Sequence, residues 1–99
     1  MAEKVLIVGG GGSADSLAWM FAGSEHIGEI CIAPGNGGTY RFGRNVPLRT
    51  TDIDGLLRFV ERENVDFTVA STEDSLALGI VDMFQAHGHK IFEIGRAHV

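Results

Sequence analysis

One cysteine, few basic residues and no long apolar run characterise this sequence of 99 residues. Cys31 is alone, so no disulfide can form within the chain, and its place in the apolar run 29–33 is typical of a small core side chain. No stretch approaches the ~20 apolar residues that a membrane-spanning helix needs. The formal net charge of −5 argues against a broad nucleic-acid surface, which needs clustered lysine and arginine.

The N-terminus also lacks the features of a secretory signal. Residues 1–4 include two charged side chains, and the apolar run that follows stops at Gly9. Hydrophobic residues make up 44% and charged residues 21%, which is an ordinary globular balance. We therefore expect one soluble, cytoplasmic domain without a nucleic-acid or membrane partner.

The histidines and most of the basic residues are scattered along the sequence and do not indicate a catalytic or metal centre. His26, His87 and His89 have neither the spacing nor the carboxylate neighbours of a metal site, so we expect no metal ligands and no catalytic residue. Three arginines between Tyr40 and Thr50 are the local exception: Arg41, Arg44 and Arg49. They indicate either a solvated loop or a local contact with an anion.

The hydrophobic pattern alternates between strands and helices. Short apolar runs predict strands at 5–8, 30–32, 67–70 and 90–92, with a small further strand at 46–48. Helical periodicity predicts helices at 14–22, 52–63 and 75–86. Such alternation is typical of an α/β domain with a mainly parallel sheet flanked by helices. Right-handed crossovers would then place the loops 9–13, 34–38 and 71–74 at one edge of the sheet.

Two local details accompany these elements. Thr51 and Asp54 have the spacing of a capping box before the second helix, and Asn64 can end that helix. Trp19 falls on the first helix, where packing against the sheet is the expected role.

Four consecutive glycines, residues 9–12, separate the first strand from the first helix. Glycine lets backbone N–H groups approach an anion closely, and the start of a helix adds a favourable dipole, so one interpretation of this stretch is a phosphate site. The other interpretation is a tight turn that binds nothing. The stretch also satisfies G-x-G-x-x-A through Gly9, Gly11 and Ala14, which raises a small NAD(P)-binding protein as a further alternative. That reading is disfavoured because the second strand ends without a carboxylate for the ribose. The lysine of a P-loop is absent as well.

Several segments in a fixed order carry a family resemblance: VLIVGGGG at 5–12, LAW at 17–19, APGNGGT at 33–39, TDIDGLL at 51–57 and the strand at 65–69. In order and spacing these segments resemble the opening domain of phosphoribosylamine–glycine ligases, over nearly all of residues 4–92. The resemblance implies a Rossmann-like pre-ATP-grasp domain of a purine-synthesis enzyme that joins phosphoribosylamine and glycine through a glycyl phosphate. ATP and magnesium or manganese would bind to the ATP-grasp domain, which is missing here together with the C-terminal domain.

The resemblance also implies substrate-binding residues. Gly10, Gly11 and Gly12, together with Ser13, match the loop that would face phosphoribosylamine. Asn36 and Gly37 match the second loop, suited to a ribose hydroxyl or phosphate oxygen, although Asn36 as a plain turn residue is the alternative. Glu73 matches an acidic residue that would bind ribose hydroxyls or the amine, with helix capping beside Asp74 as the alternative.

This chain departs from the family pattern in two places. Where the family usually reads REHA after the glycines, residues 13–16 read SADS, so a basic residue and a histidine are replaced and Asp15 would lie near a bound phosphate. The family turn GPEAPL is written STEDSL at 71–76. A divergent ligase and a sister protein with another substrate preference both remain open.

The last residues suggest a boundary. IGRAHV, residues 94–99, is what a common short-read sequencing adapter encodes in one frame. We expect a native domain at 1–92 and a non-native tail at 93–99, derived from adapter read-through on a truncated gene; a genuine divergent C-terminus is the alternative. A fragment without its ATP-grasp domain would be inactive alone. The competing function is a stand-alone phosphosugar- or nucleotide-binding module.

Overall fold

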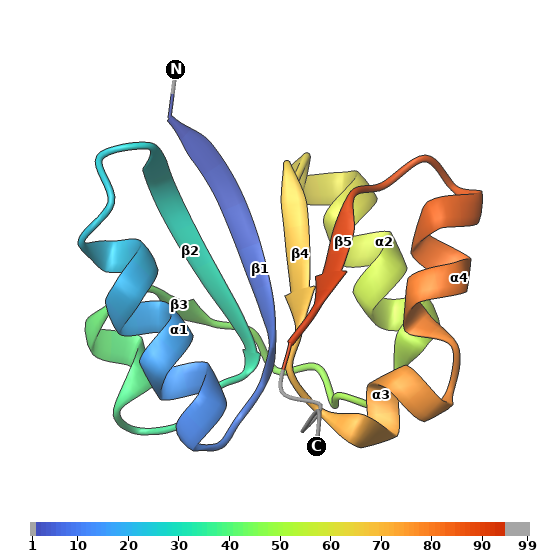
Figure 1. The fold of residues 1–99 in the computed structure, drawn as a ribbon, viewed down its shortest axis with the longest axis horizontal. Coiled ribbons are helices and arrows are strands. Elements are labelled where there is room, and N and C mark those ends of the chain that lie inside the picture. Colours follow the sequence, from blue (N-terminus) through green and yellow to red (C-terminus); the bar gives the residue numbers. More distant parts are fainter. Residues whose placement is uncertain (1, 95–99) are drawn as a thin grey trace.

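The computed structural model describes residues 2–94 and shows an α/β domain (Figure 1). Residues 95–99, where most of the expected adapter-derived tail falls, lie outside the described residues. The elements in chain order are β1 (Glu3–Gly9), α1 (Gly12–Ala22), β2 (Ile27–Pro34), the 3₁₀ turn η1 (Thr39–Arg41), β3 (Arg44–Asn45), α2 (Ile53–Glu63), β4 (Phe67–Ala70), α3 (Glu73–Ala77), α4 (Ile80–Ala86) and β5 (Ile91–Glu93).

Five parallel strands form one sheet in the order β3-β2-β1-β4-β5. The central strand β1 places Leu6 opposite Cys31 of β2 and Thr68 of β4. Residues 5–8 are completely buried, which explains why the run is apolar throughout and does not alternate. The expectation of a mainly parallel sheet flanked by helices is therefore confirmed, and all strands end at the same edge (Figure 1).

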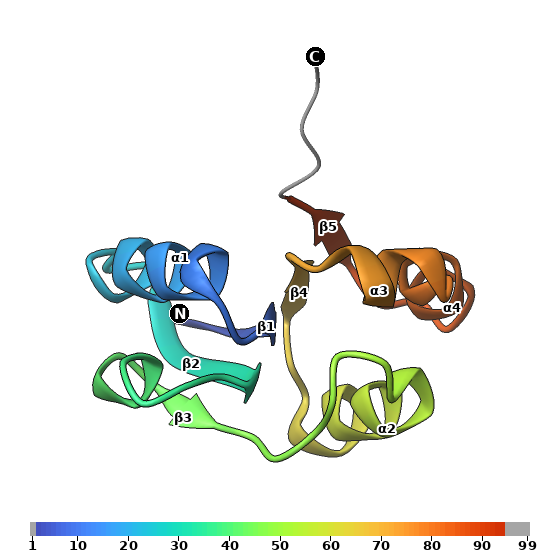
Figure 2. The ribbon, with the colours of Figure 1, turned by 90° about the horizontal axis from the view of Figure 1, so that it is seen from below.

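Helices cover both faces of the sheet (Figure 2). On one face, α1 packs its small and apolar residues against β1 and β2, in a cluster that includes Leu17, Ala18 and Ile32. On the other, α2 and α4 build the larger cluster, which includes Leu56 and Phe84. No helix within residues 2–94 is long and apolar enough to cross a membrane.

Helix α2 begins one residue later than expected and with a different cap. Asp52 is the residue before the helix, and its Oδ1 accepts a hydrogen bond of 3.0 Å from the backbone N–H of Gly55. The predicted capping box from Thr51 is therefore wrong, because the aspartate supplies the acceptor for the first turn. Asn64 ends the helix in the left-handed conformation, with φ of 56°, as expected.

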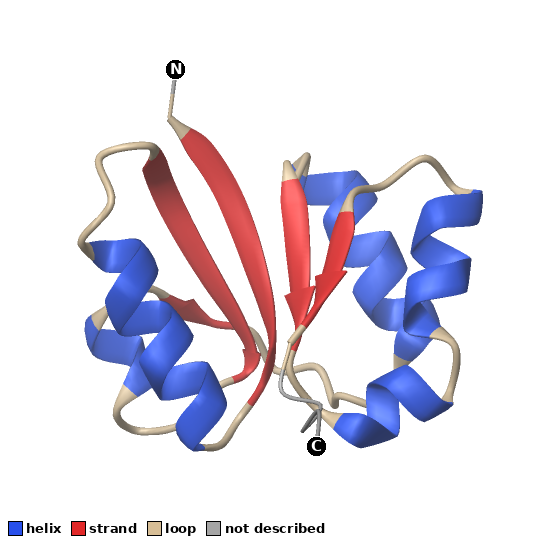
Figure 3. Cartoon of the chain, viewed as in Figure 1, coloured by secondary structure: helices blue, strands red, loops and turns tan. Residues whose placement is uncertain are grey.

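The segment predicted as one helix at 75–86 is two short helices (Figure 3). Gly79 has a φ of +82°, which no continuing helix can accommodate, and its N–H donates to the Leu76 carbonyl at 3.1 Å. Met83 then donates to the Gly79 carbonyl at 3.0 Å and opens α4. Glycine adopts a positive φ without steric cost, so the chain turns there although its apolar spacing continues.

Two smaller expectations are also corrected. The short strand predicted at 46–48 lies at Arg44–Asn45 instead: only Val46 extends the pairing, by donating to the Ile32 carbonyl at 2.7 Å, and Pro47 has no N–H to continue it. Trp19 does not pack on the sheet; its side chain is 68% exposed on the outer face of α1.

Candidate functional site

Three loops meet at the carboxyl edge of the sheet. The N–H of Gly35 donates to the Gly9 carbonyl at 3.0 Å, which joins the second loop to the first. The Ser71 hydroxyl donates to the Val8 carbonyl at 2.8 Å, which brings the third loop beside the same strand end. The predicted gathering of the loops 9–13, 34–38 and 71–74 at one edge is thus what the structure shows.

The four glycines of the first loop have different surroundings. A side chain on Gly9 would collide with the Ser71 hydroxyl, and one on Gly10 would come within 3.2 Å of the Gly35 carbonyl oxygen. At Gly11 and Gly12 an added Cβ would meet no atom within 4 Å, and neither residue has a positive φ. A side chain at either of the first two positions would therefore disturb packing within residues 2–94, whereas the last two positions leave bare backbone exposed to solvent.

Helix α1 starts at this exposed backbone. Its N-cap is Gly11, with φ of −108° and ψ of −159°, and no side chain accepts a hydrogen bond from the first turn. The amide groups that open a helix have no partner inside it and carry the positive end of the helix dipole. Ala14 is fully buried against the strand, so the helix start is fixed close to the sheet. This arrangement can bind a phosphate or carboxylate through backbone N–H groups.

Asn36 joins the first two loops through its side chain. Its Nδ2 donates to the Gly10 carbonyl at 3.0 Å and to Asp15 Oδ1 at 2.8 Å, while its Oδ1 accepts from the N–H groups of Gly38 and Thr39. Both ends of the amide are therefore engaged within the protein. Through these contacts the side chain holds the loop in shape.

Thr39 and Asn45 are positioning residues that the sequence did not reveal. The Thr39 hydroxyl is completely buried, accepts from the Asn36 N–H at 2.8 Å and lies 2.8 Å from Asn45 Oδ1. Asn45 Nδ2 donates to the Asn36 carbonyl at 2.8 Å. Gly35 completes the turn with a φ of +73°, where a side chain would collide with Asn45. The only available signal was that Thr39 ends the APGNGGT segment.

The remaining predicted site residues differ in their surroundings. Ser13 is exposed in the first turn of α1, and Gly37 is exposed with open space where a side chain would be. Glu73 is exposed at the first position of α3 and forms no ion pair within residues 2–94. No side chain caps α3 at its N-cap residue, Thr72. The neighbouring Asp74 accepts from the Ser75 N–H at 2.7 Å within the first turn. Beside it, the hydroxyl groups of Thr72 and then Thr50 lower the pKa of the Asp74 carboxyl.

The arginines at 41, 44 and 49 do not act as a common group. Arg41 Nε donates to the Gly38 carbonyl at 3.2 Å. Arg44 forms ion pairs with Glu63 at 3.0 Å and Glu29 at 3.5 Å. Hydrogen bonds to Cys31 and then to Glu63 raise the pKa of its guanidinium. Two of the three are thus committed to contacts inside the domain.

The fold defines the class of the protein as a Rossmann-like α/β domain. In such domains ligands bind at the carboxyl ends of the parallel strands, where the three loops meet. The end of β2 carries no carboxylate for a dinucleotide ribose, since Pro34 is followed by Gly35 and Asn36. The family model for the phosphoribosylglycinamide synthetase N domain matches residues 3–97. The chain therefore belongs to this family.

Curated relatives agree with the family match. The chain is 47% identical over 91 residues to the phosphoribosylamine–glycine ligase of Xylella fastidiosa (strain 9a5c), covering 90% of this chain and 21% of the relative. It is 49% identical over 96 residues to that of Ralstonia nicotianae, covering 95% of this chain and 22% of the relative, and 43% identical over 91 residues to that of Salmonella typhimurium. The chain thus spans about a fifth of the length of these relatives.

Proposed function

We propose that this chain is the substrate-binding N-terminal domain of a phosphoribosylamine–glycine ligase, and that its carboxyl edge holds phosphoribosylamine. One observation carries the assignment to this edge: Gly11 and Gly12 leave backbone bare at an uncapped helix start, where packing within the described residues does not require glycine. A phosphate bound close to that backbone would explain why both positions are glycine, because glycine allows the closest approach to the backbone N–H groups.

Each predicted residue then takes a distinct part. The N–H groups around Gly10, Gly11, Gly12 and Ser13 bind the phosphate. Gly37, with no obstruction in front of it, lets the second loop approach the ribose, and Asn36 positions that loop without binding ligand through its amide. Glu73 is free to accept hydrogen bonds from ribose hydroxyls or from the substrate amine.

Asp15 is compatible with this role because it already has a hydrogen-bond donor. Its carboxylate accepts from Asn36 Nδ2 at 2.8 Å and so ties the first turn of α1 to the second loop. The amide contact partly offsets the carboxylate charge near the phosphate position. Residues 13–16 thus lack the basic residue and the histidine that the family usually has, and Asp15 instead links the first turn of α1 to the second loop.

The complete reaction needs more than this domain. In the proposed enzyme, ATP and magnesium or manganese drive condensation of phosphoribosylamine with glycine through a glycyl phosphate, in the cytoplasm. Among residues 2–94 no three histidine, cysteine or acidic side chains come together as metal ligands, and we place the metal–ATP site elsewhere in the enzyme. We assign that site to the four fifths of the relatives outside the match, and we expect the chain alone to be inactive.

A chimera tests the proposal. Residues 3–92 would replace the aligned segment of the Ralstonia nicotianae ligase, and ATP-dependent formation of glycinamide ribonucleotide would be measured. We expect an active chimera, and we expect Gly11→Asp to raise the KM for phosphoribosylamine at least about tenfold because a carboxylate would face the phosphate. The KM values for ATP and glycine should stay unchanged.

A folded chimera with no activity would contradict the proposal, and so would a Gly11→Asp chimera with an unaltered KM for phosphoribosylamine. Thr51→Ala in the same chimera is the control, because Thr51 is exposed and neither caps α2 nor belongs to the proposed site.

A further inference from the structure

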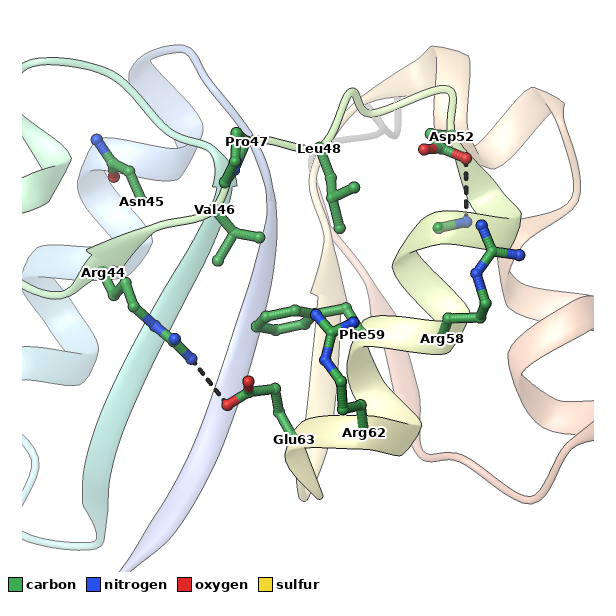
Figure 4. Close-up of a pocket in the computed structure, with 11 residues that line it drawn as sticks. Arg44, Asn45, Val46, Pro47, Leu48, Asp52, Arg58, Phe59, Arg62 and Glu63 are labelled. Carbon is green, nitrogen blue, oxygen red and sulfur yellow. Dashed lines mark hydrogen bonds and ion pairs between the residues drawn. The ribbon is translucent and has the colours of Figure 1, made fainter.

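A groove away from the glycine loop lies between β3 and α2, on the side of the sheet opposite α1 (Figures 2 and 4). Its volume is about 400 Å³, within the usual range of small-molecule sites. None of the substrate-binding residues proposed above lines it. Its lining includes Arg44, Pro47, Leu48, Arg58, Phe59 and Arg62.

Arginines stand on both walls of the groove. Arg44 stands on β3, and Arg58 and Arg62 stand one turn apart on α2 (Figure 4). Arg44 is neutralised by Glu63 and Glu29. For Arg58 and Arg62, by contrast, no ion pair occurs within residues 2–94.

Two carboxylates, Asp52 and Glu63, also line the groove, and neither forms an ion pair with Arg58 or Arg62. Asp52 caps α2 by accepting from the Gly55 N–H, and Glu63 is held by Lys4 at 2.9 Å as well as by Arg44 at 3.0 Å. Two guanidinium groups thus remain available at one groove of a chain whose net charge is −5. Guanidinium groups match phosphate oxygens in both charge and geometry.

Phe59 helps to position the arginines. Phe59 is 3% exposed, and the guanidinium carbons of Arg44 and Arg62 lie 5.6 and 5.9 Å from the centroid of its ring. The cation–π contact keeps the guanidinium group of Arg62 over the Phe59 ring in the groove (Figure 4). Opposite the helix, Pro47 and Leu48 supply an apolar surface on the segment that leaves the sheet after Val46.

We propose that this groove is a nucleotide-binding site, with phosphates bound by Arg58 and Arg62 and the base lying against Pro47 and Leu48. The site is separate from the glycine loop and from the metal–ATP site of the ligase reaction. It holds its ligand without taking part in phosphoryl transfer.

Titration of the ¹⁵N-labelled chain with ADP, and separately with inorganic pyrophosphate, tests the proposal at constant ionic strength without magnesium. We expect amide shifts in residues 46–48 and 58–62, and affinity for ADP at least about fivefold tighter than for pyrophosphate because only ADP has a base. The double variant Arg58→Gln/Arg62→Gln keeps most of the side-chain volume and should weaken ADP binding at least about tenfold.

The matched control is Arg49→Gln/Lys90→Gln, which removes the same charge from exposed positions outside the groove. It should leave ADP affinity within about twofold. Equal weakening in both double variants would show nonspecific charge attraction and overturn the site. Equal affinity for pyrophosphate and ADP would overturn the base contact. Shifts confined to Gly10, Gly11 and Gly12 would place ADP at the glycine loop and refute the groove, without affecting the ligase assignment.

Discussion

Helices α1 and α2 are both 11 residues long and both begin at the carboxyl edge of the sheet, but their first turns differ (Figure 1). In α2 the Asp52 side chain satisfies a backbone N–H of the first turn, whereas α1 begins at Gly11 with no side-chain acceptor. A cap made by the protein stabilises a helix, and an omitted cap leaves its N–H groups for a ligand. The difference supports the proposal that α1, and not α2, begins at the substrate site.

The two helices also differ in what they bury. Helix α2 buries six residues, five of them in the larger cluster, while α1 buries only Ala14, Leu17 and Ala18. Small residues let α1 approach the sheet closely. The stability of the domain should therefore depend more on α2, and its ligand binding more on α1.

Matched leucine truncations give the largest expected effect. Leu56 is completely buried and Leu17 is 7% exposed. Leucine-to-alanine changes in cores cost about 2–5 kcal/mol, and we expect Leu56→Ala near the upper end and Leu17→Ala near the lower. Urea denaturation measures both, with the exposed Ser16→Ala as a control that changes stability by less than about 0.5 kcal/mol. A larger loss of stability in Leu17→Ala than in Leu56→Ala would contradict the greater contribution of α2 to stability.

Removing the cap of α2 should have the next largest effect. Asp52→Ala should lower the free energy of unfolding by about 1 kcal/mol, because the Gly55 N–H loses its acceptor. Asp52→Asn keeps an acceptor and should recover most of that loss. Thr51→Ala should change little, since Thr51 does not cap the helix. If thermal unfolding shows Thr51→Ala to be the more harmful variant, the capping box is real and the assignment to Asp52 fails.

Adding a cap to α1 should act in the opposite direction. At Gly11 the backbone is extended and an added side chain meets nothing within 4 Å. Gly11→Ser should therefore raise the free energy of unfolding by about 0.5 kcal/mol, from the new acceptor and from a less flexible unfolded chain. Thermal unfolding checks this value. A destabilised variant would mean that the protein itself requires glycine there.

The smallest expected effect on stability comes from the ion pairs at the C-terminal end of α2. Glu63 ends α2 and binds Lys4 and Arg44, whereas no residue of α1 forms an ion pair within the described chain. Hydrogen bonds from Lys4 and then Arg44 lower the pKa of the Glu63 carboxyl below its ordinary 4.5. Its contribution is present above pH 4.5 and is lost as the pH falls through the lowered pKa.

The matching measurement is the urea midpoint between pH 3 and pH 7. Glu63→Gln should lower the midpoint at pH 7 and flatten its acid dependence. Glu25→Gln serves as the control, because Glu25 is exposed and forms no ion pair within residues 2–94. An unchanged acid slope in Glu63→Gln would show that the ion pairs do not influence stability.

The parts of the fold that were predictable have strong local signals. The runs 5–8 and 67–70 are apolar and bounded by polar or glycine residues, so both strands were placed correctly, and the four glycines identified the first loop. Strand β3 was misplaced because Arg44 and Asn45 are a two-residue edge pair without an apolar pattern. The break at Gly79 was missed because apolar spacing runs through it from Leu76 to Ile80.

Within the candidate site, residue type revealed the loops but not the contacts between them. The link from Asn36 to Asp15 spans 21 positions, and that from Asn45 to the Asn36 carbonyl spans nine. Such contacts depend on how the chain folds back on itself. The exposure of Trp19 was missed for the same reason, since helical spacing alone did not show which side of α1 the side chain would occupy.

The most direct test of the proposed substrate edge is titration of the ¹⁵N-labelled chain with ribose 5-phosphate. The account predicts saturable amide shifts concentrated at Gly10, Gly11, Gly12 and Ser13, with smaller shifts at Gly37, and their loss in Gly11→Asp. Shifts of the same size in Gly11→Asp, or no shifts at these amides when the ribose 5-phosphate is in excess, would contradict a phosphate site at the start of α1.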